Sequence, residues 1–392
     1  MSFKQKYLIK TFEICLIVFF IWFTFYGGFL IGSHFDEGWY ISEDGYNFID
    51  SAKLFKGKGL EVFVKSDLAR QASLNYIFTI ILISFLIELE NWAYIFLGIN
   101  LTLYLLSYYI LKNFLKRITQ RFDFFYLNII LIFFYFSNYE NYFYVRLILS
   151  DCIFTFLVLL IFVKFNEKRN LFNNIIFLVS VFLIFFVNPK FITIIFFLIF
   201  YQLIKYLILK NKLVSIRYFG TSIIFAYLFG LFLWSVIYTY SNIINNFEGD
   251  IFIEIKKFYL DGAIIYNRKY SDYLLNEISV IKIFYLGILR SFYFFQFWVN
   301  DWDLKHNIVN LISIFPLYLS NLLNIYNFEK YSKLNKKIVI SIIAFVIAFV
   351  FTSSITAVDY DWRIRFPLYV IFIIGLSVFT IENKFKLFRA RS

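Results

Sequence analysis

Carboxylates concentrate just after the first apolar run of the chain, where chemistry at a membrane surface would need them. Glu43 and Asp44 stand next to each other there, and Asp36 and Glu37 form a second pair a few residues earlier. A carboxylate beside a low-dielectric interface can have its pKa raised enough to take the proton of an attacking hydroxyl. Asp44 and Glu43 are candidates for that base, and a solvated loop carboxylate or a helix cap explains them equally well. The alternative register at Asp36 and Glu37 stays open.

A second acidic position follows a short polar break in the first half of the chain. Asp151 comes directly after Ser150 and directly before a long apolar run, so it falls at the start of a predicted helix. A carboxylate there can act on a reacting hydroxyl, but it also stabilises the helix dipole, which leaves a purely structural role open. Arg146, a few residues earlier, is its expected counter-charge.

Cations suited to phosphate binding stand at the ends of other apolar runs. Arg363 and Arg365 precede Pro367, and Lys190 follows Pro189 between two runs. A guanidinium group binds phosphate oxygens in a bidentate manner and keeps its charge, which suits it to a phosphate leaving group. The alternatives are that the arginines anchor a helix end at the membrane interface and that the proline only breaks a helix.

The segment that carries Glu43 has the spacing of a short helix. Phe48, Ala52 and Phe55 recur at helical intervals, and the two carboxylates suit a helix start. Gly57 is expected to close the helix in a left-handed turn. The pattern predicts an amphipathic helix that lies along the membrane surface.

The composition excludes a water-soluble globule. The 392 residues are 61% hydrophobic, and apolar segments recur from end to end. We therefore expect an all-α polytopic membrane protein with one integral membrane domain over residues 1–392. The net charge is +12, but in a membrane protein the distribution of the charges along the chain matters more than their sum. Nucleic acid is therefore not an expected partner. The apolar segments fall near residues 11–31, 74–89, 92–111, 123–138, 151–165, 175–188, 191–209, 218–241, 283–298, 307–327, 338–357 and 364–381.

The positions of Lys and Arg favour one topology. If segments 74–89 and 283–298 are re-entrant or interfacial, about ten helices cross, and every long basic connection lies on the cytosolic side. Both termini are then cytoplasmic in the inner (plasma) membrane, and residues 32–73 and 242–306 form external segments. The external side also receives the residues expected to do chemistry, namely Asp44, Asp151, Lys190, Arg363 and Arg365.

The spacing around Asp44 resembles a known family. Asp44-Gly45-Tyr46 is followed after five residues by Ala52 and after four more by Gly57 and Gly59. This pattern is similar to the first extracytoplasmic loop of the GT-C glycosyltransferases. That superfamily includes bacterial polyprenyl-phosphate-sugar transferases such as aminoarabinose transferases, protein O-mannosyltransferases and the catalytic subunit of oligosaccharyltransferase. Ser150-Asp151 resembles the family's second acidic site, and Arg363-Ile364-Arg365-Phe366-Pro367 resembles the start of its last conserved helix.

The resemblance implies a fold of about ten membrane helices with interfacial helices, and an inverting glycosyl transfer at the external face. The donor would be a polyprenyl-phosphate-linked sugar and the acceptor a surface glycan or a lipid. The catalytic carboxylates would be Asp44, Glu43 and Asp151, and the donor phosphate would be bound by Arg365, Arg363 and Lys190. A divalent ion, Mg²⁺ or Mn²⁺, on Asp44 and Asp151 is left open. Lys190 departs from the family, which commonly has Arg before the proline.

Two other functions share these substrates. A transporter or flippase of lipid-linked saccharides would place its ionisable residues near the bilayer midplane, whereas the charges here cluster at helix ends, which favours an enzyme. A glycan polymerase would differ only in its products.

Overall fold

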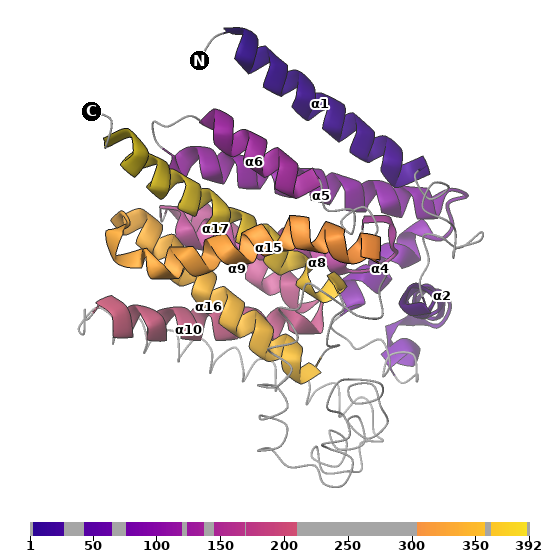
Figure 1. The fold of residues 1–392 in the computed structure, drawn as a ribbon. Helices are drawn as coiled ribbons and strands as arrows, with labels where there is room; N and C mark the ends of the chain where they lie inside the picture. The colour runs from indigo at the N-terminus through magenta and orange to yellow at the C-terminus, as the bar shows by residue number, and fades with distance from the viewer. Residues whose placement is uncertain are drawn as a thin grey trace. The chain divides into compact units, whose positions relative to one another are not determined.

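The computed structural model describes residues 3–26, 43–64, 76–119, 124–136, 145–168, 170–209, 304–356 and 362–389. Within these ranges all regular elements are helices, which confirms the all-α fold class (Figure 1). The predicted segments 218–241 and 283–298, and most of the predicted external segment 242–306, lie outside the described residues.

Most described helices coincide with the apolar runs of the sequence, where prolines are few and straight-chain or aromatic side chains predominate. They are α1 (Phe3–Tyr26), α2 (Glu43–Val64), α4 (Ile77–Leu86), α5 (Trp92–Ile118), α6 (Phe124–Phe136), α8 (Asp151–Asn166), α9 (Leu171–Phe185), α10 (Ile192–Leu209), α15 (Leu304–Tyr326), α16 (Lys333–Thr356) and α17 (Trp362–Arg389). Two 3-10 turns, η3 (Pro189–Phe191) and η4 (Phe328–Lys330), join neighbouring helices.

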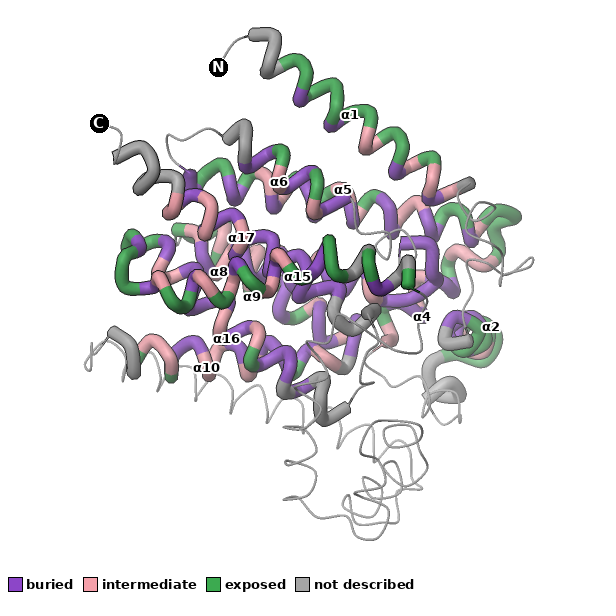
Figure 2. The backbone as a smooth tube through the Cα atoms, in the orientation of Figure 1, coloured by how far each residue is buried: buried purple, intermediate pink, exposed green. Residues whose placement is uncertain are grey.

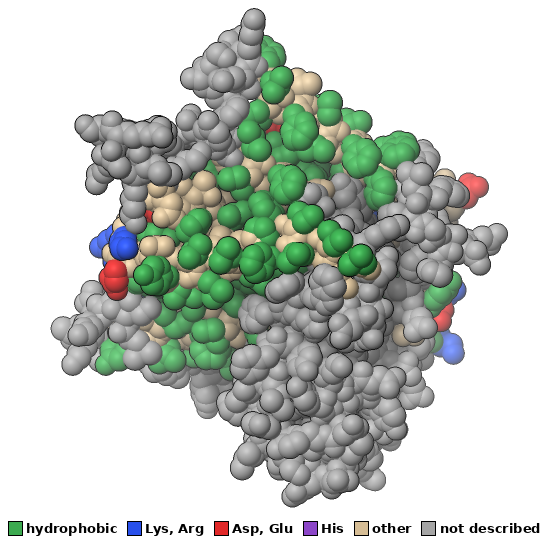
Figure 3. Space-filling view, in the orientation of Figure 1, with side chains coloured by type: hydrophobic (Ala, Val, Ile, Leu, Met, Phe, Trp, Pro, Cys, Tyr) green, Lys and Arg blue, Asp and Glu red, His purple; other side chains and the backbone are tan. Residues whose placement is uncertain are grey.

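Three stretches within the described helices are long and apolar enough to cross a membrane: Tyr7–Phe25, Trp92–Ile118 and Phe366–Asn383. The described residues therefore fit an all-α membrane protein, although they supply fewer such spans than the predicted ten. Helix α4, with 10 residues, is about 15 Å long against a hydrocarbon core of about 30 Å. Hydrophobic side chains cover most of the described surface that Figure 3 shows, as a lipid-facing surface requires.

The chain divides into two compact units. Unit 1 comprises Met1–Pro189, Trp302–Val339 and Arg365–Ser392, and unit 2 comprises Lys190–Asp301 and Ile340–Ile364. The predicted single domain over 1–392 stays a prediction.

Helix α5 lies at the centre of unit 1, where it packs on α4, α6 and α8. One face of α5 is buried along its whole length, whereas α1 exposes much of its surface (Figure 2). The hydroxyl of Tyr104 donates to the carbonyl of Tyr135 at 2.6 Å, and Tyr135 returns the bond to Tyr104 at 2.8 Å. Phe20 of α1 stacks on Tyr104 with ring centroids 4.7 Å apart. Because both hydroxyls are satisfied internally, these aromatic residues can be buried between apolar helices.

Helix α2 begins at Glu43, as predicted, and buries Phe48 and Ala52 on one side. The prediction that Gly57 ends this helix is wrong. The left-handed backbone occurs two residues later, at Gly59, with φ 78° and ψ 174°. Only glycine adopts that conformation readily, so the helix kinks there and continues to Val64.

In unit 2, α10 packs against the part of α16 that follows Val339. The hydroxyls of Thr193 and Thr352 are hydrogen-bonded at 2.6 Å, and the rings of Phe197 and Phe345 lie 5.6 Å apart in an edge-on arrangement. Polar groups in apolar helices are thus satisfied across the helix interface.

Candidate functional site

Unit 1 has two chemically different ends. The basic end is defined by the C-terminal ends of α5 and α8 and by the start of α16; it carries Lys112, Lys116, Arg117, Lys164, Lys168, Lys336 and Lys337. The Asp151 end is defined by the start of α5, the segment 145–150, the start of α8 and the end of α9. We place the candidate site at the Asp151 end, because Asp151 is the predicted catalytic carboxylate whose side chain the structure describes.

Asn100, in the third turn of α5, holds the irregular segment that leads into Asp151. Its side chain is fully buried, and its amide nitrogen donates to the carbonyls of Leu147 at 2.9 Å and Val145 at 3.3 Å. Leu147 lies in the non-helical stretch 147–150, and Val145 lies in a helical turn directly before it. An unsatisfied carbonyl is costly inside an apolar bundle, so one amide stabilises the backbone at two buried positions.

A second amide ties the end of α9 to the same segment. The side-chain nitrogen of Asn188 donates to the hydroxyl of Ser150 at 3.3 Å, and both residues are buried. The main-chain nitrogen of Phe78, in α4, donates to the carbonyl of Phe186 at 3.0 Å. The starts of α4 and α8 and the end of α9 therefore meet at this end of unit 1.

Asp151 is the first residue of α8 and is half-exposed. The first intrahelical bond runs from the nitrogen of Phe154 to the carbonyl of Ser150 at 2.9 Å. The Asp151 carboxylate therefore lies at the positive end of the helix dipole, which stabilises its charged form. Arg146 is 6% exposed, and burial lowers the pKa of its guanidinium below the usual value. Arginine starts from so high a pKa that Arg146 remains a buried positive charge at neutral pH.

Glu43 and Asp44 occupy the first two positions of α2, and their side chains lie outside what the structure describes. Helix α2 packs along α4, where the ring of Phe48 meets that of Tyr76 edge-on at 5.1 Å. Tyr76 directly precedes α4, whose start bonds to the end of α9. The start of α2 therefore belongs to the same end of unit 1 as Asp151.

The unit 1 part of α17, which begins at Arg365, also reaches this end. Phe366 stacks on Tyr104 of α5 at 6.0 Å between ring centroids, and the hydroxyl of Tyr369 donates to the carbonyl of Phe134 at 2.7 Å. Arg365, directly before Phe366, is in the first turn of α17, and its side chain is outside the described part of the structure.

The other two predicted cations belong to unit 2. Arg363 is the second residue of α17, with a side chain that is likewise not described, and Lys190 is half-exposed in η3. Pro189 opens η3 between α9 and α10, so the predicted break in the helix occurs there. Asp36 and Glu37, the alternative register, fall outside the described residues.

A divalent ion needs several oxygen ligands at one place. Among the side chains that the structure describes, no group of three His, Cys, Asp or Glu residues could hold a metal ion. Of the proposed pair of metal ligands, Asp151 alone has a described side chain. Because the side chain of Asp44 is outside the described part of the structure, a divalent ion on Asp44 and Asp151 stays a prediction.

Sequence reasoning missed Asn100, although it named Arg146 and Asp151, which belong to the segment that Asn100 holds or directly follow it. The signal was an amide in the middle of an otherwise apolar run. A polar side chain in such a run generally has a partner in the bundle. Its partners lie 45 and 47 residues further along the chain, so only the fold reveals them.

Comparisons of the chain with protein-family models, with curated proteins and with solved structures find no match.

Proposed function

We propose that the chain is an inverting membrane glycosyltransferase of the GT-C type. It would transfer a sugar from a polyprenyl-phosphate donor to a cell-surface glycan or lipid acceptor. One observation supports this most strongly. Three segments belong to one end of unit 1 although they are far apart in the sequence. They are the starts of α2 and α8, which bear carboxylates, and the part of α17 that begins at Arg365.

The reaction is a single displacement at the anomeric carbon. A lone pair of the acceptor hydroxyl attacks this carbon from the face opposite the phosphate, a new carbon–oxygen bond forms, and the bond to the phosphate oxygen breaks. Asp44, with Glu43 beside it, takes the hydroxyl proton, and polyprenyl phosphate leaves with the bonding electrons. Asp151 orients the acceptor hydroxyl. General-base assistance of this kind contributes roughly 10²- to 10⁴-fold to a rate.

The leaving phosphate gains negative charge as the bond breaks, so a cation beside it lowers the barrier. Arg365 is the preferred donor-binding residue, because it shares unit 1 with both carboxylate positions. The roles of Arg363 and Lys190 rest on the resemblance alone.

The proposed topology has about ten crossing helices in the plasma membrane, because that number places every long basic connection of the sequence on the cytosolic side. Helix α4 is too short to cross and would be interfacial, alongside the amphipathic α2. The basic end of unit 1 would face the cytosol with both termini, and the Asp151 end would face outward.

Reconstitution tests the reaction directly. Full-length protein in liposomes that contain a polyprenyl-phosphate-linked, radiolabelled sugar is mixed with an envelope fraction from cells that lack the protein. We expect labelled envelope and an equal amount of free polyprenyl phosphate, and a fall of at least about 100-fold in both for Asp44→Asn. Asp50→Asn is the matched control, because Asp50 is an exposed residue of the same helix that pairs with Lys53 at 3.7 Å.

The alternatives give different results. A flippase would move labelled donor across the bilayer without releasing polyprenyl phosphate, and a polymerase would yield chains of the sugar. Either product, or full transfer by Asp44→Asn, would contradict the proposal.

A further inference from the structure

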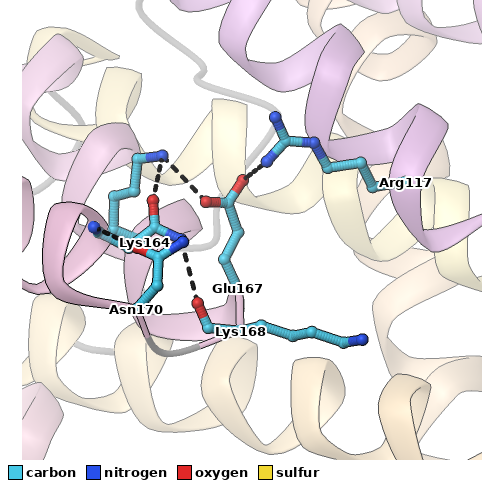
Figure 4. Close-up of polar contacts among 6 residues, drawn as sticks. Arg117, Lys164, Glu167, Lys168 and Asn170 are labelled. Carbon is cyan, nitrogen blue, oxygen red and sulfur yellow. Dashed lines mark hydrogen bonds and ion pairs between the residues drawn. The ribbon is translucent and has the colours of Figure 1, made fainter.

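The basic end of unit 1 holds an ordered group of charges in the turn between α8 and α9. The Glu167 carboxylate lies between two cations, with Arg117 Nη1 on one oxygen and Lys164 Nζ at 2.9 Å from the other (Figure 4). The Glu167 side chain is 8% exposed, whereas that of Arg117 is 65% exposed. The carboxylate therefore fixes the guanidinium group through one nitrogen and leaves most of its surface open to a ligand.

Asparagines fix the turn around this ion pair. The side chain of Asn170 caps α9 by accepting from the main-chain nitrogen of Asn173 at 2.7 Å. Asn173 accepts from Lys164 at 3.0 Å and donates to the main-chain carbonyl of Lys168 at 3.0 Å. With its backbone held, Lys168 extends its ammonium group away from Glu167 (Figure 4). Lys168 is exposed, and no described carboxylate pairs with it.

Apolar side chains begin directly beyond the turn. Leu171 and Phe172, in the first turn of α9, are 77% and 69% exposed, and Ile175 is 50% exposed. Large apolar side chains at such exposure, next to fixed cations, match the boundary between hydrocarbon and headgroups of a bilayer. A ligand for this place needs an anionic head and an apolar tail.

We propose that Arg117 and Lys168 bind the headgroup phosphate of an anionic phospholipid whose acyl chains lie along Leu171, Phe172 and Ile175. Free phosphate would use the same cations, but it would gain nothing from the apolar residues that follow. The site is distinct from the Asp151 end and does not depend on the proposed reaction.

Native mass spectrometry of the full-length protein with phosphatidylglycerol and phosphatidylcholine tests the site. Each basic residue near an anionic surface contributes enough to change affinity about fivefold. We expect phosphatidylglycerol to bind preferentially, Lys168→Gln to weaken it about fivefold, and Arg117→Gln combined with Lys168→Gln to weaken it about 25-fold. Lys53→Gln is the control, since Lys53 is also exposed but lies in α2.

Lys168→Gln removes no side-chain contact of the turn, and Lys164 still pairs with Glu167 when Arg117 is replaced. Loss of binding therefore reports on the ligand, and an unchanged unfolding midpoint verifies the fold. Equal binding of the two lipids, or full phosphatidylglycerol binding by the double variant, would overturn the proposal. Displacement of the lipid by millimolar inorganic phosphate would do so as well, because it would identify a phosphate-ion site.

Discussion

The two ends of unit 1 are held by different interactions. At the basic end, side chains of opposite charge form ion pairs: Lys112 pairs with Glu13 of α1, and Arg117 and Lys164 share Glu167. At the Asp151 end, the amides of Asn100 and Asn188 donate to backbone carbonyls and a hydroxyl, and one largely exposed ion pair, Lys56 with Glu88, joins α2 to the turn before α5.

The difference indicates that the two ends of unit 1 have different roles. Ion pairs at the basic end join helices, so these side chains have a structural role, to which the proposed lipid site adds a second one for Arg117. Amides at the Asp151 end fix the backbone before α8 without adding charge. This arrangement is compatible with the proposed transfer, in which a carboxylate takes a proton and a cation binds a phosphate.

The largest expected effect comes from breaking the buried pair at the basic end. Glu13 is 7% exposed and accepts from the hydroxyl of Tyr108 at 2.8 Å as well as from Lys112. Glu13→Leu would leave the Lys112 charge uncompensated and cost about 3 kcal/mol of stability. The double variant with Lys112→Met would recover most of it. Thermal unfolding in detergent measures both, and a single variant as stable as the wild type would show that the pair does not join these helices.

The corresponding change at the Asp151 end is expected to cost less. Asn100→Ala would remove the side-chain donor to the carbonyls of Val145 and Leu147 and lower the stability by about 2 kcal/mol. Asn113→Ala is the control, because Asn113 is exposed on the same helix. If the two variants unfolded at the same temperature, neutral amides would not be holding this end. A loss of glycosyl transfer larger than the loss of folded protein would further link Asn100 to the position of Asp151.

A smaller effect is expected where α15 and α17 approach each other closely. A Cβ atom on Gly375 would lie 1.9 Å from Oδ1 of Asn321, whose amide donates to the carbonyls of Leu317 at 2.8 Å and Phe372 at 3.2 Å. Gly375→Ala would displace this amide and cost about 1 to 2 kcal/mol. The unfolding midpoint should fall, whereas Gly98→Ala, with nothing within 4 Å, should leave it unchanged or raise it. Equal shifts would contradict a close contact at Gly375.

The smallest effect concerns the kink in α2. Gly59→Ala forces an L residue into the left-handed backbone and is expected to cost about 1 kcal/mol, while Gly57→Ala should stabilise the helix slightly. The two midpoints, measured side by side, should move in opposite directions. If both rose, the left-handed backbone at Gly59 would not be required.

Much of the described fold could be predicted from the sequence because apolar runs in a membrane leave the backbone little choice but a helix. The predicted segments at 92–111 and 151–165 correspond closely to α5 and α8. The position of the kink in α2 could not be predicted, because Gly57 and Gly59 fit a left-handed turn equally well by sequence. The contacts of Asn100 and of Glu13 link helices far apart in the chain, and no local pattern encodes such partners.

The role of Asp44 is tested most directly by mass spectrometry of surface glycans from cells that carry Asp44→Asn, with Asp50→Asn as the neighbouring control. We predict that the first variant alone lacks one specific sugar from an otherwise complete glycan, since transfer fails while glycan assembly continues. Loss of the whole glycan would indicate a translocase or polymerase. An unchanged glycan in both variants would contradict the assignment and leave Asp44 as an ordinary carboxylate at a helix start.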